Sequence, residues 1–273
     1  MRESRDLRSA NMAPIPILTY HQIAQAPARG APFRSLYVSP RSFAWQMAGL
    51  KALGYQGLSM AALMPYLLGQ KSGKVVGLTF DDGYENNLLH ALPVLRRHGF
   101  SATCYGVSQL LGRSNEWDRD NAIAAAPLMT AAQLRQWVQA GQNIGAHTRH
   151  HVHLPGLDAT KQTEEISGSR IELELALSAG SDLAQGPVTD VPKNWVGSES
   201  SVEHFCYPYG DYDELARDTV QAAGFHSATT TRRGRCQRGE DLLALPRVPV
   251  LRSTSLLVLW LKLATRYEDR RRA

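Results

Sequence analysis

Two adjacent carboxylates mark the most reactive point of this 273-residue chain. Asp81 and Asp82 directly follow the apolar run of residues 75–80 and are followed by a glycine. A run of this kind predicts a buried strand, and two like charges at its end repel each other unless a cation or a shared proton intervenes. The pair therefore indicates a metal ligand, a general base, or both.

A histidine cluster follows a second predicted strand about 65 residues later. His147 and His151 are four residues apart, so they can point to the same side of a helical turn and hold one ion. In a parallel barrel the carboxyl ends of the strands meet at one face, which would bring this cluster to the carboxylates. Two imidazoles and one carboxylate predict a three-ligand hydrolytic metal centre with a position left for water.

Three further segments carry side chains that could serve the same site. Tyr207, Pro208 and Tyr209 follow another predicted strand, although on their own they favour an aromatic turn. His21 closes the first predicted strand. Trp117 lies in a long segment, residues 112–127, that could overhang the mouth of a barrel, where it would either stack on a sugar or pack against the protein.

The elements that must position these residues alternate between strands and helices along the whole chain. Such alternation predicts a mostly parallel sheet, and about seven repeats predict a closed or distorted barrel in a single domain. Helices are expected from Pro40 to Gly54, from Asp82 to Gly99, from Thr130 to Gly141 and from Tyr212 to Gly224, whereas residues 180–201 are expected to form a surface loop. The expected strands are 15–20, 75–80, 102–107, 143–146, 204–207, 226–230 and 245–250.

Composition excludes several classes of function. The chain has 30 Lys and Arg against 25 Asp and Glu, without a basic stripe interleaved with aromatics, so a nucleic-acid-binding protein is not expected. The three cysteines lack metal-site spacing and fit a reducing compartment. Residues 1–13 lack the form of a secretory signal, which predicts a cytoplasmic location.

The last apolar segment leaves two interpretations open. Residues 256–261 are followed by Lys262, Arg266 and the terminal arginines, and they are too short to span a bilayer. They form either a last helix packed on the core or an interfacial helix with a basic flank. The second interpretation predicts peripheral contact with the inner face of a membrane.

Taken together, these segments resemble the polysaccharide deacetylase family, also called the NodB-homology domain or carbohydrate esterase family four. The resemblance runs from about Pro14 to Val250 and rests on residues 78–83 (LTFDDG), 147–151 (HTRHH) and 205–210 (FCYPYG), in that order. It implies a distorted (β/α)₇ barrel. The implied layout is a polar extension over residues 1–13, a deacetylase domain over 14–252 and a C-terminal helix with a basic tail over 253–273.

The resemblance also implies a role for each motif residue. Asp82, His147 and His151 match the ligands of a divalent metal, usually zinc in this family, and Asp81 matches the general base. A backbone N–H near the third motif, at about Tyr209, would stabilise the oxyanion. The neighbouring aromatic and proline side chains, together with the tryptophan of the overhanging segment, would contact substrate.

Two departures from the family pattern concern the acid and the base. Many members have a late histidine as general acid, but no histidine follows His226. An early Tyr-His pair resembles the subgroup of poly-N-acetylglucosamine deacetylases, which points to His21 as the acid. Many members also have an arginine where this chain has Val202, so either Arg247 supplies the missing cation or it forms a surface salt bridge.

The resemblance therefore implies a metal-dependent hydrolase that removes an N-acetyl group from an amino sugar. The expected partner is an N-acetylated glycan or a lipid-linked sugar of a glycolipid precursor. An O-acetyl carbohydrate esterase and a non-catalytic glycan-binding module are the alternatives. The second alternative would require a lost ligand or base, and both are present in this chain.

Overall fold

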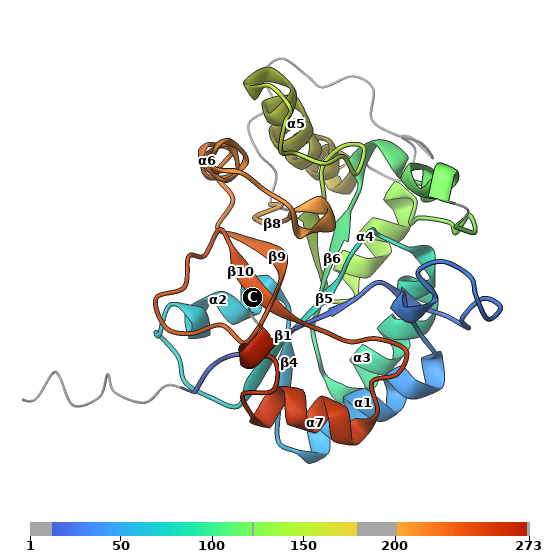
Figure 1. The fold of residues 1–273 in the computed structure, drawn as a ribbon, viewed down its shortest axis with the longest axis vertical. Coiled ribbons are helices and arrows are strands. Elements are labelled where there is room, and N and C mark those ends of the chain that lie inside the picture. The colour runs from blue at the N-terminus through green and yellow to red at the C-terminus, as the bar shows by residue number, and fades with distance from the viewer. Residues whose placement is uncertain (1–12, 122, 179–200, 272–273) are drawn as a thin grey trace, which may run out of the picture.

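Seven parallel strands form a closed ring in the computed structural model, which describes residues 13–121, 123–178 and 201–271. Each strand pairs with the next in parallel, and the pairing of β1 with β5 closes the ring (Figure 1). The predicted distorted (β/α)₇ barrel is therefore confirmed. Its strands, in order around the ring, are β1 (Ile17–Tyr20), β10 (Leu245–Pro249), β9 (Ser227–Arg233), β8 (His204–Cys206), β7 (Asn143–Ala146), β6 (Thr103–Gly106) and β5 (Val75–Phe80).

The distortion of the barrel is visible at β5. A short strand, β4 (Gln56–Leu58), pairs with the first half of β5, whereas β6 pairs with Thr79 and Phe80 in its second half. Two further short strands, β2 (Gln22–Ile23) and β3 (Tyr37–Val38), form a separate two-stranded sheet. The sequence did not reveal these three strands, because two or three residues are too few to show a periodic pattern.

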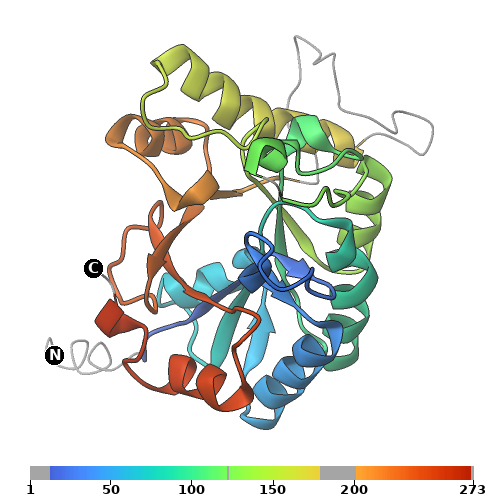
Figure 2. The same cartoon turned by 45° about the vertical axis from the view of Figure 1, so that its right-hand side comes forward.

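Helices surround the barrel, as Figures 1 and 2 show. They are α1 (Pro40–Ala52), α2 (Met60–Leu67), α3 (Leu92–His98), α4 (Ala131–Gln139), α5 (Ala159–Ser178), α6 (Glu214–Ala222) and α7 (Leu256–Ala264). A π-helical turn, η2 (Asn87–Ala91), precedes α3, and the 3₁₀ turns are η1 (Arg34–Leu36), η3 (Ser108–Leu110), η4 (Glu116–Asn121), η5 (Pro208–Gly210) and η6 (Asp269–Arg271). No helix in the described ranges is both long enough and apolar enough to cross a bilayer.

Ordinary capping chemistry sets the helix boundaries that the sequence predicted. The Ser39 side chain accepts the Ser42 N–H before α1, and Thr130 forms a reciprocal capping box with Gln133 before α4. Gly99 ends α3 in the left-handed conformation that favours glycine. The sequence did not predict α2 and α5, and most of the loop expected at 180–201 lies outside the described residues, as does most of the extension expected at 1–13.

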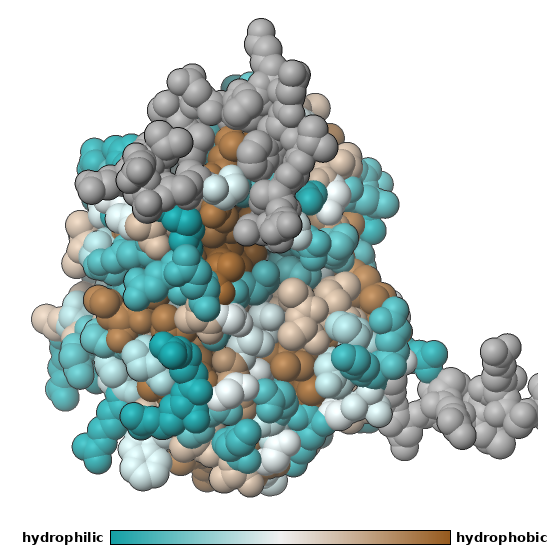
Figure 3. All heavy atoms as spheres, turned by 180° about the vertical axis from the view of Figure 1, so that it is seen from behind, coloured by the Kyte–Doolittle hydropathy of each residue, from teal (hydrophilic) through white to brown (hydrophobic). Residues whose placement is uncertain are grey.

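Strand β5 connects the core to the site. All six of its residues are buried, and its last residue, Phe80, packs against Tyr20, Phe43 and Trp137. Full burial of a side chain such as Phe80 contributes about 1.5–3 kcal/mol to stability. The packing of β5 therefore fixes the backbone position from which the Asp81 and Asp82 side chains extend. Seen from behind, hydrophilic residues and smaller hydrophobic areas are interspersed on the surface (Figure 3).

Candidate metal centre and active site

The predicted site residues meet in one pocket at the carboxyl ends of the strands. Asp81 and Asp82 follow β5, the histidine cluster follows β7, and His21 follows β1. The pocket has a volume of about 370 Å³. Of the residues predicted for the site, those that line the pocket are His21, Asp81, Asp82, Trp117, His147, His151, Tyr207, Tyr209 and Arg247.

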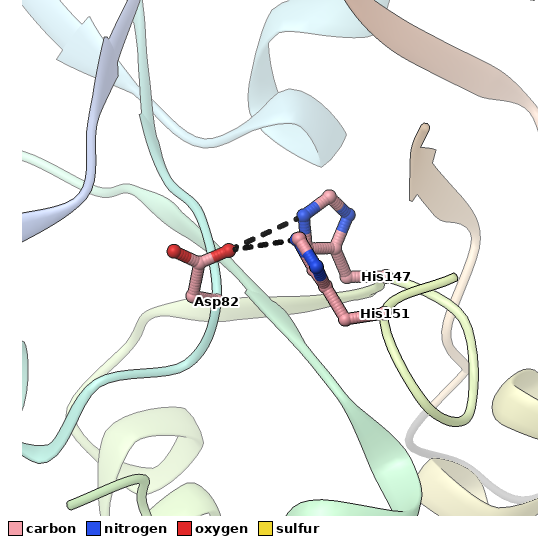
Figure 4. A group of neighbouring side chains, drawn as sticks. All are labelled: Asp82, His147 and His151. Atoms are coloured by element: carbon pink, nitrogen blue, oxygen red, sulfur yellow. Dashed lines mark ion pairs between the residues drawn. The ribbon is translucent and has the colours of Figure 1, made fainter. Parts of the chain in front are cut away.

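Three buried side chains form a compact set of metal donors. One oxygen of Asp82, Oδ1, lies 3.4 Å from Nε2 of His147 and 3.4 Å from Nε2 of His151 (Figure 4). Ligand atoms from these three residues lie within 4.8 Å of one another. One carboxylate and two imidazoles are a donor set that divalent zinc accepts, with a fourth position left for water.

The hydrogen bond behind His147 favours a cation over a direct contact with Asp82. Nδ1 of His147 lies 2.6 Å from the backbone carbonyl of Cys206, and a carbonyl accepts only from a protonated nitrogen. In neutral His147 the proton is therefore on Nδ1, and the Nε2 lone pair faces the Asp82 carboxylate. Two lone pairs facing each other are stabilised by a shared cation, so these residues fit a divalent metal.

The electrostatics of the three groups favour a positive charge beside Asp82. Burial raises the pKa of Asp82, but interactions with His147 and His151 bring that pKa well below its usual value. Burial lowers the pKa of His147, but interactions with Cys206 and Asp82 raise it well above its usual value. Burial keeps the pKa of His151 below its usual value. The carboxylate is thus ionised and attracts positive charge to this point.

The two histidines are not on a helical turn, so that part of the sequence interpretation was wrong. Thr148 and His151 have φ values of 63° and 58°, which are left-handed and incompatible with an α-helical turn. The Thr148 hydroxyl accepts the His151 N–H at 3.0 Å and donates to the His147 carbonyl at 2.6 Å. This tight turn, with Asp82 also left-handed at φ 74°, aims the ligands at one point, at a cost of about 1–3 kcal/mol for each strained residue.

Two carboxylates on α5 support this turn from outside the pocket. Glu165 accepts the backbone N–H groups of Arg149 at 2.9 Å and of His150 at 3.1 Å. Glu172 accepts Nε of Arg149 at 2.9 Å and the Ser108 hydroxyl at 2.6 Å. The sequence interpretation missed both residues. Their spacing in the sequence could have revealed them, because two acids seven residues apart lie on the same face of a helix.

Arg247 lies against Asp81 inside the barrel. Its Nη1 donates to Oδ1 at 2.6 Å and its Nη2 donates to Oδ2 at 2.7 Å, while its Nε donates to the Thr230 carbonyl at 2.8 Å. Only 1% of the Arg247 side chain is exposed, so this is a buried pair and not a surface salt bridge. Val202, at the position where many family members have arginine, is buried in the apolar core.

The environment of Asp81 keeps this carboxylate ionised. Burial raises the pKa of Asp81, but the charge and hydrogen bonds of Arg247, with smaller contributions from His21 and His147, bring it below its usual value. The Thr19 hydroxyl also donates to Oδ2 of Asp81 at 3.3 Å. Nε2 of His21 lies 3.9 Å from the same oxygen, and 24% of the His21 side chain is exposed.

Aromatic rings enclose the metal-facing side of the pocket. Trp117 stacks on the His151 ring at a centroid distance of 4.3 Å, and Tyr209 meets the same ring edge-on at 4.7 Å. Tyr209 also stacks on His153 at 3.9 Å. Trp117 therefore packs on the protein, and its stacking on a sugar stays a prediction.

The remaining residues of the third motif have structural contacts. The hydroxyl of Tyr207 donates to the Leu243 carbonyl at 3.0 Å, and its ring is buried. Pro208 begins the η5 turn and is not among the residues that line the pocket. Its predicted contact with substrate is therefore not supported by its position.

Apolar side chains form much of the opposite wall, and sequence reasoning missed them. They come from the segment between β2 and α1 and from the segments after η4 and β10, which have no periodic pattern. They are Phe33, Leu36, Tyr37, Ile123, Val250 and Leu251. The pocket thus combines a floor of charged and polar side chains with an apolar side wall.

Comparison with known proteins agrees with this geometry. A family model described as polysaccharide deacetylase matches residues 69–196. The putative polysaccharide deacetylase YxkH of Bacillus subtilis is 28% identical over 246 residues, which cover 89% of this chain and 74% of that protein.

Solved structures of deacetylases are similar to this chain over almost its whole length. The Streptococcus pyogenes deacetylase PplD, in complex with acetate, is 25% identical with a TM-score of 0.74 and covers 93% of this chain and 99% of its own. The putative polysaccharide deacetylase BA0330 of Bacillus anthracis is 25% identical with a TM-score of 0.71 and covers 92% of this chain and 69% of its own. IcaB of Ammonifex degensii, 21% identical with a TM-score of 0.71 and covering 92% of this chain and 97% of its own, shares the fold. In its barrel, its ordered motifs and these comparisons, the chain is similar to polysaccharide deacetylases.

Proposed function

We propose that this protein is a metal-dependent hydrolase that removes the N-acetyl group from an amino sugar in a glycan or glycolipid precursor. One observation carries the proposal. The same pocket holds a three-residue donor set for a divalent metal and, next to it, a second carboxylate that is kept ionised by a buried arginine. Amide hydrolysis needs both an electrophilic centre and a base, and this arrangement supplies residues for both.

Asp82, His147 and His151 would hold the metal, for which zinc is our proposal. A bound divalent ion would supply a Lewis acid and lower the pKa of the attacking water. The chain prepares the site for it. The Cys206 carbonyl fixes the tautomer of His147, and the stacked Trp117 and the edge-on Tyr209 hold the His151 ring.

Asp81 is the proposed general base. Each of its oxygens accepts one N–H of Arg247, which fixes the plane of the carboxylate and leaves further lone pairs to accept a proton from water. Because Arg247 holds both oxygens, Asp81 is less available than Asp82 as a metal ligand. The base and the metal donors therefore have separate side chains.

His21 is the proposed general acid. An amide nitrogen leaves only when it is protonated, and His21 lies in the pocket beside the base, 3.9 Å from Oδ2 of Asp81. A proton taken up by Asp81 can thus be matched by one delivered from His21 to the leaving amine. The backbone N–H at Tyr209, a residue that also lines the pocket, is the proposed oxyanion donor.

The apolar side wall supports an amphiphilic substrate. Phe33, Leu36 and Leu251 line the pocket together with the catalytic residues. A free sugar would leave this wall in contact with water, whereas a sugar attached to an apolar carrier would cover it. We therefore propose a lipid-linked N-acetyl sugar as the preferred substrate. The cytoplasmic location stays a prediction from the sequence.

Acetate release from a panel of substrates tests this function. Free, nucleotide-linked and lipid-linked N-acetyl sugars are compared, with and without a chelator and after metal is restored. We expect release from at least one N-acetyl sugar, abolished by the chelator and recovered with zinc. Chelator-insensitive release would overturn the metal site, and release only from O-acetyl sugars would replace the proposed reaction with ester hydrolysis.

A further inference from the structure

The outer surface of α1 and α7 exposes large apolar side chains. Leu256, Leu257 and Trp260 of α7 are 45%, 67% and 42% exposed, and Trp45 of α1 is 58% exposed. The two helices lie side by side in Figures 1 and 2, and Leu256 packs against Gly49, one turn from Trp45. We call these four side chains, Trp45, Leu256, Leu257 and Trp260, the α1–α7 patch. Large exposed apolar patches mark sites of interaction.

The helices that carry this patch contain no acidic residue. There is no Asp or Glu between residues 8 and 80 or between residues 242 and 267, which include all of α1 and α7. The neighbouring α3 also lacks acids and carries Arg96 and Arg97. Cationic side chains are exposed around the patch, among them Arg41 and Arg252. Within the described ranges, neither of these two forms an ion pair with a carboxylate.

The patch adjoins the mouth of the pocket. The helix α7 follows the barrel strand β10, and α1 follows β3, whose Tyr37 lines the pocket, so the first turns of both helices lie near its mouth. The Arg252 N–H donates to the Ser35 carbonyl at 2.8 Å. This bond joins the segment before α7 to the segment that carries Phe33, which lines the pocket and is 57% exposed. The segment that carries Arg252 thus lies next to the segment that contributes Phe33 to the pocket wall.

From these observations we propose that the α1–α7 patch docks on an anionic lipid bilayer, with Trp45, Leu257 and Trp260 at the headgroup level and with Arg41 and Arg252 facing the lipid phosphates. Tryptophan and leucine flanked by cations are the side chains that bind at this depth of a membrane. Each cation near an anionic surface adds to the attraction. The mouth of the pocket then lies close to the membrane surface.

A second copy of the chain fits this surface less well. A twofold symmetric dimer would place the same patch on both subunits and bring its cations against each other without an acid between them. A bilayer that contains anionic lipids supplies the missing negative charge. The charge pattern therefore favours the bilayer as the occupant of the patch.

Vesicle co-sedimentation without any substrate tests the proposal, so its outcome is independent of the proposed reaction. The full chain is mixed with vesicles of phosphatidylcholine alone or of phosphatidylcholine and phosphatidylglycerol, at low and high salt. We expect binding to the anionic vesicles that weakens with salt. The variant Leu257→Ser/Trp260→Ser should bind about tenfold more weakly. The control Leu68→Ser/Leu215→Ser, which removes exposed leucines at the end of α2 and on α6, should bind like the unchanged protein.

A second pair of variants tests the charge. Arg41→Glu/Arg252→Glu should lower vesicle binding at least about tenfold, whereas Lys71→Glu/Lys161→Glu, with the same change in net charge at other exposed positions, should have a much smaller effect. Thermal unfolding and acetate release from a soluble sugar serve as folding controls. Equal binding by the Leu257→Ser/Trp260→Ser variant, or equal binding to neutral vesicles, would overturn the proposal. It would also be overturned by a dimer in sedimentation velocity that dissociates in this variant without any binding to vesicles.

Discussion

Asp81 and Asp82 are neighbours in the chain, yet they face different partners in the pocket. Arg247 of β10 neutralises Asp81 through two short hydrogen bonds, whereas Asp82 faces two imidazole rings at 3.4 Å. The left-handed backbone of Asp82, at φ 74°, turns the two side chains apart. The carboxylates are chemically identical, so their roles are assigned by the strands that surround them. Beside Asp81 the protein supplies the cation itself, as Arg247. Beside Asp82 it supplies only donor atoms, so the position of the cation is left to a metal ion.

The largest effect is expected for the metal side of this comparison. Asp82→Ala removes the only carboxylate of the donor set, so bound zinc after dialysis should fall to background and turnover should fall by at least about a thousandfold. Metal content is measured by elemental analysis beside acetate release. Asp218→Ala, an exposed carboxylate on α6, is the control. Full metal content in Asp82→Ala would contradict the ligand assignment.

Asp81→Asn tests the other carboxylate. The amide keeps the shape of the side chain but cannot take a proton, so turnover should fall about 10²–10⁴-fold while zinc content is unchanged. The same two measurements apply. If both aspartate variants lost zinc equally, the separation of base and ligand would have to be withdrawn.

The next largest effect is expected for His21→Asn, which tests whether the general acid lies beside the general base, Asp81. We expect normal zinc content and a loss of about 10²–10³-fold in acetate release from an N-acetyl sugar. The loss from an O-acetyl ester should be smaller, because an alkoxide leaves more readily than an amide nitrogen. His226→Asn, a largely exposed histidine away from the pocket, is the control. Unchanged amide hydrolysis in His21→Asn would refute its role.

The sequence predicted all seven barrel strands, because short strand-like segments, several of them apolar, alternate with helices and are bounded by turn residues. It did not predict α5, because polar residues such as Gln162, Glu172 and Glu174 interrupt the apolar stripe on the buried side of that helix. It placed the two histidine ligands on a helical turn, because left-handed residues other than glycine leave no mark in composition. For Asp81 the sequence offered Arg247 as a partner but left a surface salt bridge open, because the pairing depends on the register of β10, 166 residues away.

Arg247→Met tests, through the free energy of unfolding, whether Asp81 depends on its buried arginine. Removal of this guanidinium leaves Asp81 buried without its cation, and the free energy of unfolding should fall by about 3–5 kcal/mol. In an Asp81→Asn background the same change should cost much less, because no buried charge remains unpaired. Urea denaturation of the four proteins gives the coupling energy. Arg217→Met, which breaks the more exposed pair with Asp241, should change the free energy of unfolding far less than Arg247→Met does. Equal costs of Arg247→Met in both backgrounds would show that the Arg247–Asp81 pair is not coupled.

The smallest effect is expected outside the pocket, at Glu165. This carboxylate accepts the N–H groups of Arg149 and His150, in the turn between the two histidine ligands. Glu165→Gln keeps one acceptor oxygen but loses the negative charge, so the turn should be held less firmly and zinc affinity should fall about 10–100-fold. Turnover should recover when zinc is saturating, because no reacting group is changed. Zinc affinity is measured by competition with a chelating dye.

The adjacent Glu164 gives a matched control for this position. It is an exposed acid on the same turn of α5, so Glu164→Gln changes the charge of the helix by the same amount without touching the histidine turn. Equal zinc affinities in the two variants would mean that the Thr148 hydrogen bonds and the contact of Arg149 with Glu172 hold the turn without Glu165. A selective loss in Glu165→Gln would instead show that the metal side, unlike the Asp81 side, depends on a helix outside the barrel to keep its ligands aligned.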